Sequence, residues 1–425
     1  MYETPAEIQA TLDALDAFLA AEIQPLEQAN PQFFDHRREY ARTDFDNDGR
    51  PRAEWVALIV EMRRRAEAAG WFRYGLPKEL GGRGASNLEM AYIREHLGLR
   101  GIGLHDDPLY ESAVVGNFPV QLAFHAAATE EQKREWLEAM IVGERRVAMG
   151  LTEPNVGSDL LRMETTAIRD GDDWIIDGVK RWQSGMDVAT HNLVFARTAG
   201  NPGEPLGITA FIVPTDAPGF DTEFFWWTMN MPSDHAEITL NQVRVPHSAM
   251  LGQENLGLLP LLTFVHDQRM RQAAQSLGAA QYCINEAVDY ANARLLHGKP
   301  LSRKQAIRFA LAELHTEAAM VRGLIRDVAA QLDSTDAHKL SHLVAMCNYR
   351  ANRLACAAAD QAMQTCGGVG YSRHMPFEHI YRRHRRYRIT EGADELQLKE
   401  IAKELFGSVR GDATRRDPRA WPAPR

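Results

Sequence analysis

The sequence predicts a mainly helical α+β fold, in which one compact antiparallel β domain lies between two helical parts. Three observations predict it. Apolar residues near the N-terminus recur at helical spacing. From about residue 145, short apolar runs alternate with Gly, Pro and Asp, which is typical of antiparallel strands. After Pro246, long helical patterns return. A length of 425 residues fits about three domains, and the predicted divisions are 1–145, 146–250 and 251–410, with a tail at 411–425.

The first part is expected to be helical throughout. Its first helix presents one apolar face, and a Thr-Pro-Ala-Glu capping box at residues 4–7 is expected to start it. A second helix covers 53–71 and is closed by Gly70, and a third starts with Thr129 as its cap. Residues 76–84 between them are predicted to form a loop. The apolar face of the first helix consists of Ile8, Leu12, Leu15, Leu19 and Ile23.

The middle and last parts differ in periodicity. In the middle part, runs rich in β-branched and aromatic residues predict strands at 173–178, 191–198, 207–214 and 236–246. In the last part, sustained helical periodicity predicts helices at 261–295, 303–333, 336–363 and 392–407. The Pro- and Arg-rich tail is expected to fray.

Composition excludes several classes of protein. The net charge of −9 argues against a nucleic-acid-binding protein, because such proteins usually carry a basic face. The four cysteines form no C-x-x-C pair, which fits a reduced, cytoplasmic chain without disulfides. The N-terminus lacks the basic segment of a signal peptide, and no apolar run of ~18 residues predicts a membrane span. We also predict no metal site.

The stretch MGLTEPNVGSD at 149–159 is the first candidate site. Gly157 frees backbone N–H groups, and Thr152 and Ser158 add hydroxyls, so the segment offers donors suited to ring carbonyls, ring nitrogens or phosphate. Equally, it can be a pair of tight turns that caps a sheet. The stretch KRWQSG at 180–185 also has two interpretations. Its Trp can pack at a sheet edge or form a flat wall against an aromatic cofactor.

Two further stretches break helices. At 293–305, Arg294 ends one helix and Gln305 opens the next, where such residues can hold a pyrophosphate or an adenine. Compensation of the helix dipole and a solvated loop would explain the same residues. At 364–371, Gly367 and Gly368 allow close approach of a ligand, although they fit a plain helix C-cap too. Their spacing is not that of a dinucleotide-binding fingerprint.

The last candidate is Glu391-Gly392, at the head of a predicted helix and just after five arginines. A solvated or salt-bridged basic face and an acid favoured by the helix dipole would explain this segment without any chemistry. The five arginines are Arg382, Arg383, Arg385, Arg386 and Arg388.

Taken together and in this order, the five stretches resemble the acyl-CoA dehydrogenase family. LTEPNVGSD resembles the family's signature turn, RLLHGKPL its Arg-x-x-Phe-Gly element, and QTCGGVGY with EGADEL its closing motif. The resemblance extends from LPKELGG to KEIAKEL. It implies an N-terminal helical domain, a middle β domain and a C-terminal four-helix bundle, with FAD at their junction and a homotetramer or homodimer that completes the FAD site.

The resemblance also assigns residues to the cofactor and to the substrate. Ser158, Arg269 and Gly392 are expected near the substrate, Arg269 beside its CoA part. Gln364, Gly367 and Gly368 would reach the FAD of a partner subunit, and Arg294 and Gln305 would hold its pyrophosphate and adenine side. The residues assigned to the flavin are Met149, Leu151, Thr152, Gly157 and Ser158, with Trp182 and Ser184 against its reactive face.

In such enzymes the Glu of the Glu-Gly pair removes the α-proton of an acyl thioester, while hydride leaves the β-carbon for flavin N5. The resemblance therefore makes Glu391 the catalytic base, with its own N–H donating to the thioester carbonyl. One subgroup places its base on a bundle helix, at the position of Gln268, which cannot act as a base. The glycine at 392 would give the substrate room.

Four positions depart from the family pattern. His297 replaces an aromatic residue near the adenine, Ala393 replaces a hydroxyl residue after Glu-Gly, and Glu395 replaces a Gln; all three belong to the predicted cofactor site. Thr390 stands where some members carry Tyr, so the acyl pocket is expected to have another shape.

The sequence thus predicts an FAD-dependent acyl-CoA dehydrogenase that passes electrons to an electron-transfer flavoprotein. One alternative is an oxygen-using flavoenzyme of the same fold, such as an acyl-CoA oxidase, a nitroalkane oxidase or a flavin monooxygenase. The monooxygenases need no carboxylate base and the nitroalkane oxidases carry Asp at this position, so Glu391 favours a dehydrogenase or an acyl-CoA oxidase. The other alternative is a helical scaffold without catalytic activity.

Overall fold

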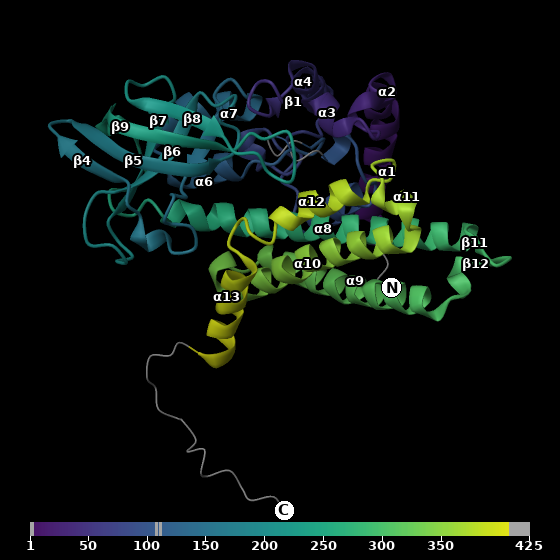
Figure 1. Ribbon diagram of the computed structural model, residues 1–425. Helices are drawn as coiled ribbons and strands as arrows, with labels where there is room; N and C mark the ends of the chain where they lie inside the picture. The colour runs from purple at the N-terminus through teal and green to yellow at the C-terminus, as the bar shows by residue number, and fades with distance from the viewer. Residues whose placement is uncertain (1–3, 107–108, 110–112, 408–425) are drawn as a thin grey trace, which may run out of the picture.

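A computed structural model describes residues 4–106, 109 and 113–407. The N-terminal helices and a twisted sheet lie side by side, and long helices of the C-terminal part run beneath both (Figure 1). This is the predicted α+β fold. The predicted tail at 411–425 lies outside the described residues, and the three domain boundaries remain a proposal.

The N-terminal part buries the apolar face predicted for its first helix. Leu12, Leu15, Leu19 and Ile23 are buried, and a π-helical turn over Leu19–Ile23 joins α1 to α2. The helices and strands of this part are α1 Ala6–Phe18, α2 Gln24–Ala29, α3 Arg38–Arg42, β1 Thr43–Asp44, β2 Arg50–Pro51, α4 Ala53–Ala68, α5 Asn87–Gly98, α6 Pro119–Ala127 and α7 Glu130–Val142.

One predicted cap forms and another does not. Thr129 caps α7 through a complete capping box with Gln132. At α1 the capping box is wrong, because Pro5 occupies the N-cap position and makes no side-chain cap bond. A proline side chain has no acceptor for the free N–H groups of the first turn.

The middle part is an eight-stranded sheet in the order β10-β7-β6-β4-β5-β9-β8, with β3 paired to β6. Neighbours are antiparallel, except that β6 pairs in parallel with β3 and, at one position, with β4. The strands are β3 Val147–Gly150, β4 Thr166–Asp170, β5 Asp173–Gln183, β6 His191–Arg197, β7 Ile208–Pro214, β8 Phe220–Phe225, β9 Ala236–Pro246 and β10 Met250–Leu251. β3, β4, β8 and β10 were not predicted, because β3, β4 and β10 are short and β4 and β8 are mostly exposed.

The C-terminal part is the predicted helical bundle. α8 and α10 pack closely because their facing residues are mostly small, such as Ala273, Ala280, Ala355 and Ala359, all fully or almost fully buried. The elements are α8 Leu259–Ala293, β11 Leu295–Leu296, β12 Lys299–Pro300, α9 Gln305–Leu332, α10 Ser341–Cys366, α11 Gly368–Tyr371, α12 Phe377–Arg386 and α13 Asp394–Phe406. Among the described helices, none is long and apolar enough to cross a bilayer.

The arginine block forms α12, which ties the bundle to the N-terminal part. Arg38 of α3 is buried, and its guanidinium donates to the Arg373 and Met375 carbonyls and pairs with Glu378. Arg382 of α12 pairs in turn with Glu378. Arg382, Arg383 and Arg388 of the block thus act as structural partners, with ion pairs to Glu378, Asp106 and Asp394.

Candidate functional site

Glu391 lies in the turn between α12 and α13, in a left-handed conformation with φ +55°. This conformation costs about 1–2 kcal/mol for a residue with a Cβ, so other contacts must hold it. Arg269 of α8 donates to the Glu391 carbonyl from Nε at 2.9 Å and from Nη2 at 2.8 Å. Gln397 donates to the same carbonyl at 3.2 Å and to the Gly392 carbonyl at 2.8 Å. The backbone that carries the candidate base is therefore fixed from two helices.

Glycine at position 392 is favoured by its backbone conformation and by this packing. Its φ of +92° is unfavourable for other residues, and a Cβ there would lie 2.9 Å from Nη2 of Arg269. The sequence had attributed this glycine to room for the substrate. The left-handed backbone is a second reason for glycine, and the close approach of the Arg269 guanidinium adds to it.

Arg269 thus has a contact that the sequence did not reveal. Its burial lowers its pKa from the ordinary value, and nearby Glu391 partly offsets the effect. Because an arginine pKa starts far above neutrality, the side chain stays charged. Its guanidinium holds the turn at residues 387–393, here called the acid turn. The predicted contact of Arg269 with CoA stays a proposal.

A second set of contacts joins the beginning of the acid turn to the first residue of α13. The Asp394 N–H donates to the Arg388 carbonyl at 3.1 Å, and the Arg388 side chain donates back to the Asp394 carboxylate at 2.9 Å. Arg353 of α10 adds a bond of 3.1 Å to the same carboxylate oxygen. These reciprocal bonds restrict the turn that contains Glu391, which favours a base of fixed position.

The first two predicted stretches lie together. The Arg181 N–H donates to the Thr152 carbonyl at 2.8 Å, and Lys180 Nζ donates to the Leu151 carbonyl at 3.3 Å. Met149 and Leu151 also pack against an apolar cluster that contains Leu261 and Phe264, near the start of α8. The signature turn, the end of β5 and the first turns of α8 therefore meet at one junction.

A buried ion pair that the sequence analysis missed holds this junction. Lys180 Nζ lies 2.8 Å from Glu153 Oε1, and both side chains are at most 1% exposed. Glu153 also accepts from the N–H groups of Glu164 and Thr165 at 2.6 and 2.9 Å. Burial lowers the pKa of Lys180 to about 8 although Glu153 opposes the shift, while Lys180 keeps the pKa of Glu153 below its ordinary value against the effect of burial. Each partner thus favours the charged form of the other.

The Trp182 ring is partly exposed, as expected for a side chain that packs against a cofactor. It adopts φ +65° at an irregularity of β5 and is 44% exposed. One side of its ring packs against Trp226, at 4.7 Å between centroids. Of the two interpretations of this residue, packing at a sheet edge accounts for that side, and the exposed remainder is free to cover an aromatic ligand.

Six other predicted cofactor residues lie far from this junction. α8 has 35 residues, so at ~1.5 Å per residue it spans about 50 Å. The hairpin that follows it lies at the end of the bundle remote from the sheet (Figure 1). The exposed residues at this remote end are Arg294, His297, Gln305, Gln364, Gly367 and Gly368. One dinucleotide cannot reach both ends of α8 within a single chain.

Other predicted residues flank the acid turn. Ala393 is the N-cap residue of α13 and makes no side-chain cap bond, and Glu395 is exposed in the first turn of that helix. Gln268 is buried on α8, and its Oε1 accepts from Arg271. It therefore serves an internal contact.

The junction fits the isoalloxazine of FAD. The partly buried Met149 and Leu151 form an apolar surface near the exposed Trp182 ring. Within the part of the chain that the structure describes, three nearby hydroxyls have no protein hydrogen-bond partner and can serve a ligand with many acceptors. They belong to Thr152, Ser158 and Ser184.

The three-part architecture, with helical N- and C-terminal domains around a middle sheet domain, is that of a flavoprotein oxidoreductase that acts on acyl-CoA. The chain belongs to the acyl-CoA dehydrogenase family. Family models match along almost the whole chain: the N-terminal domain at residues 5–144, the middle domain at 148–243 and the C-terminal domain at 255–406. Members of this family depend on FAD.

Two relatives are similar over most of their length. The 3-(aryl)acrylate reductase of Clostridium sporogenes is 33% identical over 87% of this chain and 97% of its own. The mitochondrial short-chain specific acyl-CoA dehydrogenase of Bos taurus is 32% identical over 84% and 86% of the two chains. Among solved structures, an acyl-CoA dehydrogenase from Geobacillus kaustophilus superposes with a TM-score of 0.77 at 27% identity, covering 95% of this chain and 99% of its own.

Proposed function

We propose that this enzyme desaturates an acyl-CoA thioester between its α- and β-carbons, with Glu391 as the base. The observation that carries this proposal is the arrangement of Arg269 and Gln397 around the Glu391 carbonyl. They hold the backbone of one carboxylate in a conformation that it would not adopt alone. The alternative position on α8 holds Gln268, which is neutral.

In the proposed reaction the Glu391 carboxylate takes the α-proton of the acyl group as the C–H bond breaks and the α,β double bond forms. Bound FAD supplies the acceptor for the hydride that leaves the β-carbon. The Glu391 N–H donates to the thioester carbonyl, where negative charge develops. A well-placed base contributes about 10²–10⁴ to the rate, and one donor to the developing oxyanion about 10²–10³.

The enzyme is proposed to work as a homo-oligomer, because the two halves of the predicted FAD site lie at opposite ends of α8. A second copy can bring the residues around Arg294 to the flavin junction of the first. The surface at this end exposes large apolar side chains, with Leu295 59%, Phe309 60% and Tyr371 85% exposed, as at contacts between subunits. Sedimentation should give a mass of at least two 47.7 kDa chains, whereas a flavin-loaded monomer would contradict the proposal.

The proposed reaction is tested by bleaching of the flavin. Under anaerobic conditions, at least one acyl-CoA in a panel of different lengths and branching should bleach the absorbance of the oxidised enzyme and yield a 2-enoyl-CoA. Free acids of the same chains should have no effect. Failure of every acyl-CoA to bleach a fully flavin-loaded enzyme would refute the proposal.

The same assay separates the alternatives. If electron-transfer flavoprotein reoxidises the bleached enzyme much faster than oxygen, the enzyme is a dehydrogenase; the reverse order would make it an acyl-CoA oxidase. The similarity to a reductase from Clostridium sporogenes makes the direction of the reaction a further question. Reoxidation of the reduced enzyme by 2-enoyl-CoA alone would favour work in the reductive direction.

A further inference from the structure

We propose that Asp234 is a positioning residue for the flavin. Its buried carboxylate fixes the turn at residues 182–186, here called the flavin turn, and its charge lowers the reduction potential of bound FAD. The flavin turn carries Trp182 and Ser184, the two residues that the resemblance assigns to the reactive face of the flavin. The inference rests on the part of the proposed function that places FAD at this junction, and the identity of the acyl group does not enter it.

The first observation is that the carboxylate and the backbone of Asp234 both bind the flavin turn. Asp234 is 6% exposed, and its Oδ2 accepts from the Gly185 N–H at 3.1 Å. Its backbone carbonyl accepts from the Met186 N–H at 3.2 Å. Because the peptide group is planar and trans, the Ser184 carbonyl of the same peptide as the Gly185 N–H points away from Asp234. A Cβ at Gly185 would meet no atom within 4 Å, so the turn is tied down on its buried side and faces open space at this glycine.

The second observation is that the segment containing Asp234 also supports the Trp182 ring. Trp226 packs against one side of that ring, at 4.7 Å between centroids. The Trp226 N–H donates to the carbonyl of His235, the residue next to Asp234, at 2.8 Å. One short segment therefore supports the flavin turn at both its aromatic ring and its backbone.

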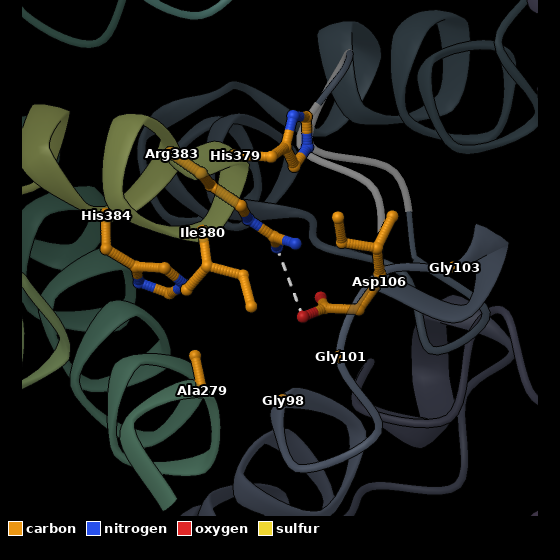
Figure 2. Close-up of a pocket in the computed structure, with 10 residues that line it drawn as sticks. Gly98, Gly101, Gly103, Asp106, Ala279, His379, Ile380, Arg383 and His384 are labelled. Atoms are coloured by element: carbon orange, nitrogen blue, oxygen red, sulfur yellow. Dashed lines mark ion pairs between the residues drawn. The ribbon is translucent and has the colours of Figure 1, made fainter. Parts of the chain in front are cut away.

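The third observation is that the same segment is joined to α12, the helix that leads into the acid turn. Arg382 of α12 donates to the Met229 carbonyl at 2.6 Å. The next residue, Arg383, pairs with Asp106 of the N-terminal part (Figure 2). The segment that holds the flavin turn is thus attached to the helix that precedes the proposed base. A flavin and a base must be held in a fixed relative position for the reaction to be fast.

The charge of Asp234 is expected to act on the flavin as well. Burial alone would raise the pKa of this carboxyl, but His235 and Arg386 of α12 lower it below the ordinary value. His235 Nδ1 lies 2.7 Å from Asp234 Oδ1. Both groups therefore favour the ionised carboxylate. Uptake of two electrons and one proton adds one negative charge to a flavin ring, and a fixed negative charge nearby opposes this reduction.

The test separates the charge from the hydrogen bond with two variants. Asparagine keeps an acceptor for the Gly185 N–H, so Asp234→Asn should bind FAD nearly as tightly as the wild type. Its reduction potential, measured without substrate by equilibration with a reference dye, should rise by about 30 mV, which is a tenfold change in the two-electron equilibrium. A unit charge about 10 Å from a ring has an effect of this size. Asp234→Ala removes the acceptor too, so it should also bind FAD about tenfold more weakly, the value of one hydrogen bond.

Asp172→Asn is the matched control for the loss of one negative charge. Asp172 is exposed in the turn before β5, and the flavin turn lies at the other end of this strand, about 30 Å away at ~3.3 Å per residue. This control should leave the potential unchanged.

Two results would overturn the inference. In one, Asp234→Asn shifts the potential no further than Asp172→Asn does. In the other, Asp234→Asn loses FAD and thermal stability as severely as Asp234→Ala, which would make Asp234 a structural residue. These measurements need no acyl-CoA, so their outcome does not depend on the bleaching assay. If no acyl-CoA bleached the flavin while the potential of Asp234→Asn rose, the proposed reaction alone would have failed.

Discussion

Glu391→Gln is expected to bind FAD and acyl-CoA as the wild type does. Its rate of flavin bleaching should fall by about 10²–10⁴-fold. Glutamine keeps the size of the side chain and leaves the backbone carbonyl in place for Arg269 and Gln397. It removes only the group that takes the α-proton. The measurement is single-turnover bleaching in a stopped-flow instrument, with substrate affinity determined separately by titration.

A matched control distinguishes loss of the base from a general loss of negative charge. Glu404 is exposed on α13, the helix that follows the acid turn, so Glu404→Gln makes the same chemical change away from the site. It should bleach at the wild-type rate. If Glu391→Gln retained more than about a tenth of the wild-type rate, another group would have to be the base.

The parts of the fold that could be predicted are those where burial of apolar residues sets the sequence pattern. The long bundle helices were predicted to within a few residues except at the start of α10, since each keeps an apolar face over many turns. α12 was not predicted, because its inward residues include Arg383 and His384, which are buried in polar contacts. There the pattern of hydrophobicity no longer reports which side of the helix is inside.

The site was predictable where short motifs carry the chemistry, and not where it depends on distant contacts. Glu391 and Trp182 could be proposed from the resemblance to a family. The hydrogen bonds from Arg269 to the Glu391 carbonyl join residues 122 positions apart. Only the structure could reveal this contact. The separation of Arg294 from the flavin junction was accessible in principle, because a predicted helix over 261–295 already implied about 50 Å.

The largest expected effect on stability comes from Lys180→Met. The change leaves Glu153 buried and still bonded to two backbone N–H groups, but without its cation. Removing one partner of a buried ion pair typically costs about 3–5 kcal/mol. For 425 residues unfolding as a unit, at ~2.1 cal/mol/K per residue, this corresponds to a fall of about 3–6 °C in Tm. Differential scanning calorimetry measures it.

The double variant Lys180→Met with Glu153→Gln decides whether the pair itself is the cause. With both charges removed, the uncompensated carboxylate no longer exists, so we expect the double variant to be more stable than Lys180→Met alone. Flavin content gives a second measurement. Lys180 also donates to the Leu151 carbonyl, so loss of the lysine should lower the ratio of bound FAD to protein in both variants. A double variant no more stable than Lys180→Met would show that the lysine acts by packing rather than by its charge.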